Sequence, residues 1–387
     1  MLPSKRQRLR HSTGVEPNTN NHQLPFLPSE LIVEILLRLP ARTLVQFRCV
    51  CKLWKTLISD PNFANKHLLN SIADSTMSHQ RLAFHGCSYT LNSIFENPST
   101  LVIDRFNGLE NADAYHYYIL GSCNGFLCLY DPDPHQSNII MYNPSIGLKS
   151  ESSPKIKPSS DWEVLYYGFG YDHVNDKYKV LAVVEHDDGD IHDDDFGQSL
   201  AKIYTFGEDS WRKIQDLPYI PTNQRYGKYV SGTLNWVAPT LNYPTGYVIV
   251  SFDLDKETYR DVLLPQNVAV TDYMCRPSIC VLNHSLCLCY VNKTHLVVWL
   301  MKEYGVVDSW TKLMSIPREK LTFLNSIEPY STIELLFISE NGGVLLMVSS
   351  QLILYNLNCG ELDYPSISVE DVYDPQIYCE SLISPRW

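Results

Sequence analysis

The chain has no apolar run long enough to cross a membrane. The stretch LIVEILLRL is interrupted by Glu34 and Arg38, whereas a spanning helix needs about 20 mostly apolar residues. The N-terminus also lacks the apolar segment of a secretory signal. Charged residues are few (19%) and hydrophobic residues are many (44%), which excludes a wholly disordered chain. We therefore expect a folded protein of the cytoplasm or nucleus, without a membrane partner.

Cysteine pairs with metal-binding spacing are also absent. None of the 11 cysteines belongs to a C-x-x-C pair, and the C-x-C pairs at 49–51 and 287–289 lie in segments of helical and strand pattern. An odd number of cysteines scattered through apolar runs favours reduced thiols over a disulfide framework. We expect no metal site and no cofactor.

Recognised catalytic motifs are missing as well. The sequence contains no G-x-S-x-G elbow, no Walker A loop and no H-E-x-x-H helix. The string GFGYD at 168–172 lacks the third glycine of a phosphate-binding loop and a following helix, and a closely packed strand explains it better. No cysteine has the His and Asn neighbours of a transthiolating ligase. The sequence thus predicts no catalytic residue and a protein that is not an enzyme.

Positive charge is scarce outside the first part of the chain. Residues 1–69 contain ten Lys and Arg and four Asp and Glu, a balance of +6, whereas the remaining residues contain 21 and 39, a balance of −18. Such acidity repels phosphate, so the larger part is not expected to bind nucleic acid. It would attract a basic partner protein, or it serves only solubility.

Residues 27–63 carry the most informative pattern. Their apolar residues recur at helical spacing in two runs separated by Pro40, and a unit of about 40 residues cannot bury so many apolar side chains alone. The surplus indicates a partner protein. The residues that form the pattern are Leu27, Pro28, Leu31, Ile35, Leu36, Leu39, Pro40, Leu44, Arg48, Val50, Cys51, Trp54, Leu57, Ile58 and Phe63.

In order and spacing, these residues resemble an F-box. The resemblance implies docking onto a Skp-type adaptor, which connects to a cullin, its RING subunit and the ubiquitin-conjugating machinery. Trp54 and Leu57 are also expected to hold the module together. The residues predicted to bind the adaptor are Leu27, Pro28, Leu31, Ile35, Leu36, Leu39, Pro40, Leu44, Val50 and Trp54.

From about residue 80, short runs of Val, Ile, Tyr, Phe and Leu alternate with Gly, Asn, Asp and Pro turns, which predicts strands joined by hairpins. One aromatic position recurs at intervals of 62, 48, 47 and 56 residues, as Tyr142, Tyr204, Phe252, Trp299 and Tyr355. A period near 50 is typical of kelch-type propellers. Five units are visible, and the strand-like stretch near 82–104 leaves room for a sixth blade; an irregular β-sandwich is the alternative.

The phrases GSCNGFLCLYD, YNPSIG, YGFGYDHVNDKYKV, VSGTLNWVA and FDLDKETY resemble the F-box-associated domain of plant F-box/kelch-repeat proteins, although the paired glycines of true kelch repeats are incomplete. The expected fold is α+β and multidomain: a small helical F-box followed by a mostly-β kelch-like propeller of six blades. The predicted parts are a disordered basic and polar tail (1–24), the F-box (25–69), a connector (70–80) and the propeller-like domain (81–387). The tail's run KRQRLRH is an import signal or a solvated charge cluster.

Two features are candidates for binding a target protein. The segment EHDDGDIHDDDF at 185–196 holds seven carboxylates, and we interpret it as a solvated hairpin connection or a contact for a basic target; its spacing does not match a calcium loop. Aromatic residues on loops could be binding hot spots, namely Tyr115, His116, Tyr117, Tyr118, Tyr226 and Tyr243. The predicted target-binding residues are Asp187, Asp188, Asp190, Asp193, Asp194, Asp195 and Tyr117.

The resemblance implies a substrate-recognition subunit of an SCF-type ubiquitin ligase. In this interpretation the F-box binds the adaptor and the acidic domain binds a target of unknown identity. The alternative is a non-ligase scaffold or ligand sensor.

Overall fold

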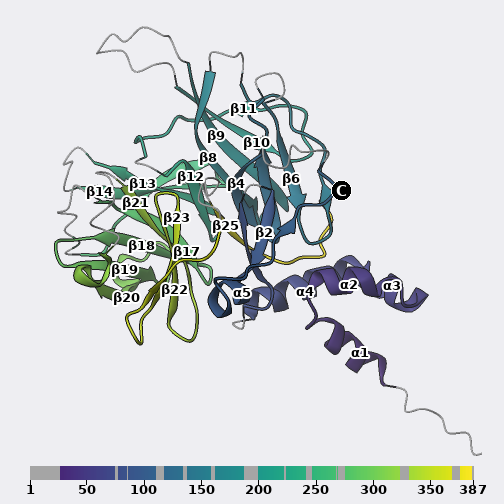
Figure 1. Ribbon diagram of the computed structural model, residues 1–387. Coiled ribbons are helices and arrows are strands. Elements are labelled where there is room, and N and C mark those ends of the chain that lie inside the picture. Colours follow the sequence, from purple (N-terminus) through teal and green to yellow (C-terminus); the bar gives the residue numbers. More distant parts are fainter. Residues whose placement is uncertain are drawn as a thin grey trace, which may run out of the picture.

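The computed structural model covers most of the chain from Leu27 onward. The residues that it describes are 27–74, 77–84, 86–109, 117–133, 137–157, 162–186, 199–221, 224–240, 246–266, 268, 275–322, 331–367 and 375–385. They form a helical module followed by a mostly-β propeller (Figure 1). The predicted tail at 1–24 lies outside the described residues.

The N-terminal module contains α1 (Ser29–Leu36), α2 (Ala41–Phe47), α3 (Lys52–Ile58) and α4 (Pro61–Ala73). A proline is the N-cap of both α1 and α2. At the start of α4, the Asp60 carboxylate accepts hydrogen bonds from the backbone amides of Asn62 and Phe63, at 2.8 and 3.1 Å. Pro61 occupies the first turn, where its missing N–H would have no partner in any case. Local sequence signals therefore set where these helices begin.

Hydrogen bonds join the described strands of the propeller into five sheets. One contains β1 (Gln80–Phe84), β2 (Cys87–Thr90), β3 (Asp104–Arg105) and the C-terminal β25 (Gln376–Cys379), with α5 (Leu91–Glu96) after β2. The next contains β4 (Tyr118–Cys123), β5 (Phe126–Tyr130), β6 (Ile139–Asn143) and β7 (Leu148–Lys149). Both are antiparallel throughout.

The largest sheet has eight strands, in the order β11-β10-β9-β8-β12-β13-β14-β15. These are β8 (Trp162–Asp172), β9 (Lys177–His186), β10 (Ser199–Thr205), β11 (Arg212–Lys213), β12 (Tyr226–Val230), β13 (Thr233–Pro239), β14 (Tyr247–Asp253) and β15 (Thr258–Val262). Its two antiparallel halves are joined by a short parallel pair, in which Tyr226 and Gly227 of β12 lie opposite Tyr167 and Gly168 of β8.

Two further sheets complete the domain. One contains β17 (Ser278–Leu282), β18 (Ser285–Val291), β19 (His295–Met301) and β20 (Trp310–Pro317), with short 3-10 helices η2 (Val307–Ser309) and η3 (Arg318–Lys320) on either side of β20. The other contains β16 (Cys275–Arg276), β21 (Ser331–Ile338), β22 (Gly343–Val348), β23 (Gln351–Asn356) and β24 (Leu362–Asp363). The sequence predicted six blades, whereas hydrogen bonding in the described residues gives five sheets because β8 and β12 pair.

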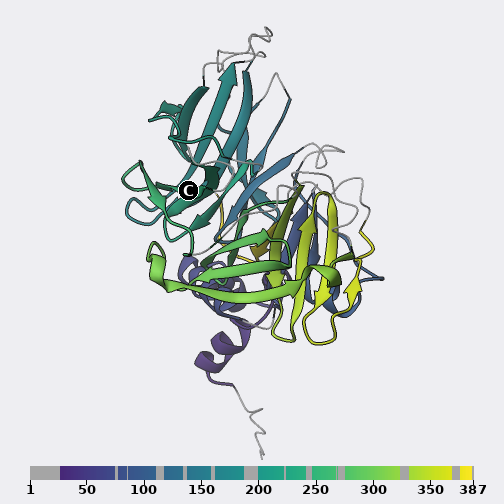
Figure 2. The ribbon, with the colours of Figure 1, turned by 90° about the vertical axis from the view of Figure 1, so that its left-hand side faces the viewer.

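The core lies between neighbouring sheets. The sheet of β1 packs on β4–β6 through Ala83, Ile119 and Leu127, and on β21–β23 through a second cluster that includes Leu82 and Leu345. The first sheet therefore contacts both the second and the last, so the ring closes by packing. Figure 2 shows the sheets from the side, with the helical module at one end of the ring.

Glycines allow close packing on one buried tryptophan. Trp236 is fully buried, and a Cβ atom added to Gly227 would lie 2.4 Å from its indole ring. A Cβ added to Gly168 would lie 3.0 Å from the same ring. Since real atoms cannot approach so closely, this part of the eight-stranded sheet requires residues without side chains.

A buried lysine ties the two halves of the eight-stranded sheet together. The Lys179 ammonium on β9 donates to the Leu254 carbonyl at 2.7 Å, and it forms ion pairs with Asp172 at 2.8 Å and Glu257 at 3.1 Å. Burial alone would raise the pKa of Asp172, but hydrogen bonds from Lys179 and Asn175 lower it to about 2. The ammonium is thus held by one acceptor from its own half of the sheet, Asp172, and two from the other half, Leu254 and Glu257.

Candidate partner-binding surfaces

The helical module exposes a group of large apolar side chains. Leu31 and Ile35 lie one turn apart on α1 and are each about half exposed, at 49% and 51%. Leu27 and Val50 are also exposed, at 54% and 61%, as is Pro28. Scattered exposed apolar residues are ordinary, but several on one small module indicate a protein-binding surface.

Two residues of the predicted contact set lie inside the module instead. Leu36 and Leu44 are 1% and 0% exposed and pack with Ile58 and Phe63. A fully buried side chain offers no contact area in this conformation, so adaptor contact through Leu36 and Leu44 stays a prediction. Helical spacing marks positions as apolar but does not tell the core side of a short helix from its outer side.

Three members of the predicted set are intermediate. Leu39, Pro40 and Trp54 are half-buried, and both Leu39 and Trp54 pack against the module's core. The Trp54 ring lies 5.4 Å from that of Phe47, as expected for a residue that holds the module together. Sequence reasoning missed Leu53, which is 68% exposed; no spacing signal distinguishes it from its neighbours.

Charged groups fix the helical module to the propeller. The Glu380 carboxylate, just after β25, accepts a hydrogen bond from the Ala41 backbone amide at 2.9 Å. The same carboxylate pairs with Arg81 of β1 at 3.2 Å. Arg81 also pairs with Asp104 of β3, which in turn pairs with Arg42 of α2 at 2.8 Å. We call Ala41, Arg42, Arg81, Asp104 and Glu380 the junction cluster.

Charge is retained within this junction cluster despite burial. Burial alone would lower the pKa of Arg81, but its neighbours Tyr378, Glu380 and Asp104 raise it. The guanidinium therefore stays charged and satisfies two carboxylates at once. A buried charge of this kind is tolerated only where it is paired and hydrogen-bonded.

The C-terminal segment adds apolar and polar contacts to the junction. Leu382 is buried in the core of the helical module. The Asn143 side-chain amide donates to the carbonyls of Ser381 and Ile383, at 3.0 and 2.8 Å. On the helical side, His67 of α4 is hydrogen-bonded to the Leu39 carbonyl at 2.8 Å. The helices therefore pack directly against the propeller and its C-terminal segment, in addition to being connected to it through residues 70–80.

The residues predicted to bind a target fall into two groups. Asp187, Asp188, Asp190, Asp193, Asp194 and Asp195 lie outside the described residues, as do Tyr115, His116 and Tyr243. Tyr117 is half-buried and packs against the core between β1 and β4–β6. In contrast, Tyr118 is 44% exposed, and together with Tyr226 it lines a pocket of about 530 Å³.

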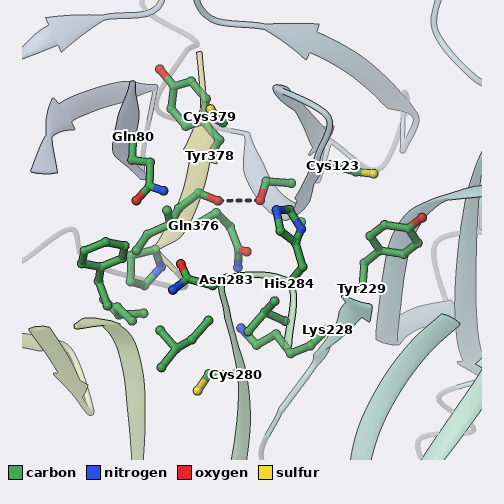
Figure 3. Close-up of a pocket in the computed structure, with 18 of the residues that line it drawn as sticks. Gln80, Cys123, Lys228, Tyr229, Cys280, Asn283, His284, Gln376, Tyr378 and Cys379 are labelled. Carbon is green, nitrogen blue, oxygen red and sulfur yellow. Dashed lines mark hydrogen bonds between the residues drawn. The ribbon is translucent and has the colours of Figure 1, made fainter. Parts of the chain in front are cut away.

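A second cavity, which we call the axial cavity, lies where the innermost strands of the sheets meet. It has a volume of about 230 Å³ and is lined by parts of β1, β4, β8, β12, β17, β21 and β25. Figure 3 shows Gln80, Lys228, Asn283, His284 and Gln376 gathered around this space. Lys228 is paired with Glu334 across it, and Ile72 of α4 also lines it. The cavity therefore has polar groups and a paired charge beside apolar side chains such as Phe169 and Leu335, and it is in contact with the helical module.

The thiols at this cavity stay protonated. Burial raises the pKa of Cys123, and the pKa of Cys280 is raised by a hydrogen bond with Cys287 and by burial. A thiol held in this form is a poor nucleophile and a poor metal ligand. No group of three or more His, Cys, Asp and Glu side chains lies within metal-binding reach in the described part of the chain.

Two family comparisons match the two parts of this architecture. Residues 24–66 match the F-box domain, and residues 77–375 match the F-box associated beta propeller domain. The chain belongs to the F-box proteins. The second match covers most of the chain, so the family and the tandem layout predicted from the sequence are confirmed.

Full-length relatives support the same family. This F-box protein is 32% identical over 374 residues to the F-box/kelch-repeat protein At3g23880 of Arabidopsis thaliana, with 93% of this chain and 96% of the relative covered. It is 27% identical over 382 residues to the F-box protein CPR1 of the same organism, with 92% and 88% covered. Within the described residues, no helix of this F-box protein is both long and apolar enough to cross a membrane.

Proposed function

We propose that this F-box protein is the substrate-recognition subunit of an SCF-type ubiquitin ligase. The observation that supports the proposal most directly is the set of exposed apolar side chains on a helical module that charged groups fix to the propeller. Burying these side chains against a partner would favour binding by about 25 cal/mol per Å² of apolar area removed from water. A Skp-type adaptor, and through it a cullin and a RING subunit, is the partner that the family suggests.

The proposed adaptor contacts are a refined version of the sequence prediction. They comprise the exposed residues Leu27, Pro28, Leu31, Ile35, Val50 and Leu53, together with the accessible parts of Leu39, Pro40 and Trp54. Leu36 and Leu44 act indirectly, because they hold the helices that carry these side chains. Separating the two groups makes the proposal testable, since only substitutions at the exposed residues should affect binding without affecting stability.

In this proposal the chain performs no chemistry and needs no cofactor. Its contribution is proximity: a target held on the propeller is brought near the conjugating enzyme, which raises the effective concentration of the target's lysine. The junction cluster supports this mechanism because it fixes the angle between adaptor and target. The proposed location is the cytoplasm, the nucleus or both.

The proposed target is a basic protein. The balance of −18 over residues 70–387 would favour its encounter. The acidic segment with Asp187, Asp188, Asp190, Asp193, Asp194 and Asp195 stays part of this proposal, and Tyr117 stays as a contact through its accessible part.

We also propose that the propeller has six blades. The support is the strand order: the eight-stranded sheet consists of two four-stranded antiparallel runs, β8–β11 and β12–β15. Counting each run as a blade gives six units, with β25 completing the first.

Adaptor capture tests the function. The double variant Leu27→Ala/Pro28→Ala should lose co-purification with a Skp-type adaptor while its thermal unfolding stays unchanged. Val174→Ala is the matched control, because Val174 is 72% exposed but lies in a propeller turn. Retained capture by the double variant would overturn the assigned contacts.

The second candidate is a non-ligase scaffold or ligand sensor. The axial cavity favours a sensor, because α4 contributes Ile72 to its lining and a ligand there would touch both domains. The two candidates are separated by reconstituting the ligase with a captured partner. Ubiquitin transfer to that partner supports the ligase, whereas binding without transfer supports the scaffold or sensor.

A further inference from the structure

Four tyrosines form a continuous group at one end of the propeller. Tyr118 of β4 lies directly opposite Tyr130 of β5 in the antiparallel ladder. The rings of Tyr130 and Tyr167 are 5.5 Å apart, and those of Tyr167 and Tyr226 are stacked at 6.0 Å. All four line the 530 Å³ cavity, which we call the tyrosine pocket. Its volume lies within the range of about 300–1,000 Å³ that is typical of small-molecule sites.

The mouth of the tyrosine pocket carries excess positive charge. Lys157 and Arg225 line it together with one carboxylate, that of Glu163. Arg225 is exposed and Lys157 is half-buried, and neither forms an ion pair with another described residue. Two such cations stand out in a domain whose overall balance is −18.

The backbone beside both cationic residues is held by hydrogen bonds. The Arg225 carbonyl accepts a hydrogen bond from the Tyr167 amide at 2.8 Å, and the preceding Gln224 side chain forms two hydrogen bonds with Ile279 of β17, at 2.8 and 3.0 Å. Lys157 follows Ile156, whose amide donates to the Ser137 carbonyl at 2.9 Å. These bonds fix where both side chains leave the chain at the pocket, which reduces the backbone entropy lost when a ligand binds.

The tyrosine hydroxyls at the floor of the pocket stay neutral. Burial raises the pKa of both Tyr130 and Tyr167, while the positive charge of Arg225 acts on Tyr167 in the opposite direction. The hydroxyls therefore add no negative charge of their own, and the field of Arg225 reaches the floor. A ligand would meet aromatic rings, neutral hydroxyls and two cations.

From this combination we propose that the tyrosine pocket binds a small aromatic anion. The ring system lies against the tyrosines, and a carboxylate or comparable group lies between Arg225 and Lys157. The pocket is at the start of β4, whereas the turn after β4 at Asn124–Gly125 packs on Ser381 beside the helical module. At ~3.3 Å per residue, these two ends of β4 are about 20 Å apart, so the ligand occupies the end of the propeller away from the helices.

The proposal goes beyond the ligase function and does not depend on it. A bound ligand at this end would form part of the surface offered to a target, which makes target binding responsive to the ligand. It would leave the exposed apolar face of the helical module free.

The test uses the purified full chain and two probes that share a ring system but differ in charge, naphthoate and naphthamide. Calorimetry should show saturable binding of naphthoate and at least tenfold weaker binding of naphthamide. Arg225→Gln should weaken naphthoate binding at least tenfold without affecting naphthamide, and Tyr118→Ala should weaken both. Higher salt should weaken naphthoate binding only.

Lys256→Gln is the charge-matched control, since its side chain is 73% exposed in a turn far along the chain from the pocket. The proposal is overturned if both probes bind equally, if neither binds saturably, or if Lys256→Gln weakens naphthoate as much as Arg225→Gln does. Thermal unfolding confirms that each variant is folded. Adaptor capture is measured on the same samples, so that a failure of this proposal is distinguished from a failure of the ligase proposal.

Discussion

The carboxylate of Glu380 accepts a hydrogen bond of 2.9 Å from the backbone amide of Ala41, which lies 339 positions earlier in the chain. Ala41 begins α2, so this carboxylate takes the place that a local N-capping side chain would otherwise fill. The negative charge also suits the positive end of the helix. A residue near the C-terminus thus completes a helix near the N-terminus.

Replacing this carboxylate should weaken the whole protein. Glu380→Gln leaves the buried Arg81 with only one carboxylate partner, and breaking a buried pair costs about 3 kcal/mol. Urea denaturation should therefore show a loss of that size in the free energy of unfolding. Glu34→Gln is the control: its pair with Arg38 is exposed, with side-chain exposures of 64% and 79%, and should change stability by less than about 0.5 kcal/mol.

Stability and adaptor binding should separate within the helical module. Leu44→Ala removes a fully buried side chain and should lower the free energy of unfolding by about 2–4 kcal/mol. Val50→Ala removes an exposed one, so it should leave stability within about 0.5 kcal/mol and weaken adaptor capture. Denaturation and adaptor titration of both variants check this. Equal effects of the two variants on stability would contradict the burial assigned to them.

Asp172 should control part of the acid sensitivity. Its pKa in the folded protein is about 2, below the ordinary value of 3.8, so its ionised form is the one that stabilises the fold. That contribution is fully present above pH 3.8 and is lost as the pH falls through about 2. Asp172→Asn should be less stable at neutral pH but should lose less stability over that acid range. Stability measured against pH tests this, with the exposed Glu340→Gln as control; parallel curves for Asp172→Asn and the unmodified protein would contradict it.

Two strand glycines that line the axial cavity should respond differently to alanine. At Gly227 a Cβ would lie 2.4 Å from the Trp236 ring, whereas at Gly121 the nearest atom is 3.5 Å away. Gly227→Ala should therefore lower stability by about 1–3 kcal/mol or more, the range for overpacking. Gly121→Ala should be tolerated. Thermal unfolding of the two variants is the measurement, and similar melting temperatures would show that the eight-stranded sheet adapts around Trp236.

Local features of the fold were predictable from the sequence, and distant ones were not. Proline positions and apolar spacing at 27–63 predicted the helices, because helix starts depend on residues within one turn. The turns of the β region were equally visible. The role of Glu380 was not predictable, because no sequence pattern near it indicates a contact with Ala41. The pairing of β8 with β12 was not predictable either, because it depends on how the sheets are arranged in the ring.

The candidate site shows the same division. Sequence identified Leu31 and Ile35 as apolar, and the structure was needed to separate them from the buried Leu36. The sequence singled out Tyr118 and Tyr226 as aromatic residues. It could not show that they line one pocket, because Tyr226 is brought beside Tyr167 by the parallel pairing of β8 with β12. Arg225 carried no signal, since an isolated arginine becomes informative only when the fold places it in the same pocket as the tyrosines.

The pairing of β25 with β1 has a consequence for synthesis. Residues 376–379 leave the ribosome long after β1, yet they form an edge of the first sheet, and the Glu380 carboxylate directly after them accepts a hydrogen bond from the first amide of α2. Until residues 376–379 have been made, β1 lacks one neighbour, and an unpaired strand edge invites association with other chains. The β1 edge therefore stays open during this interval, and a chain that stops before residue 376 would lack both the β25 partner of β1 and the Glu380 contact that fixes the helical module to the propeller.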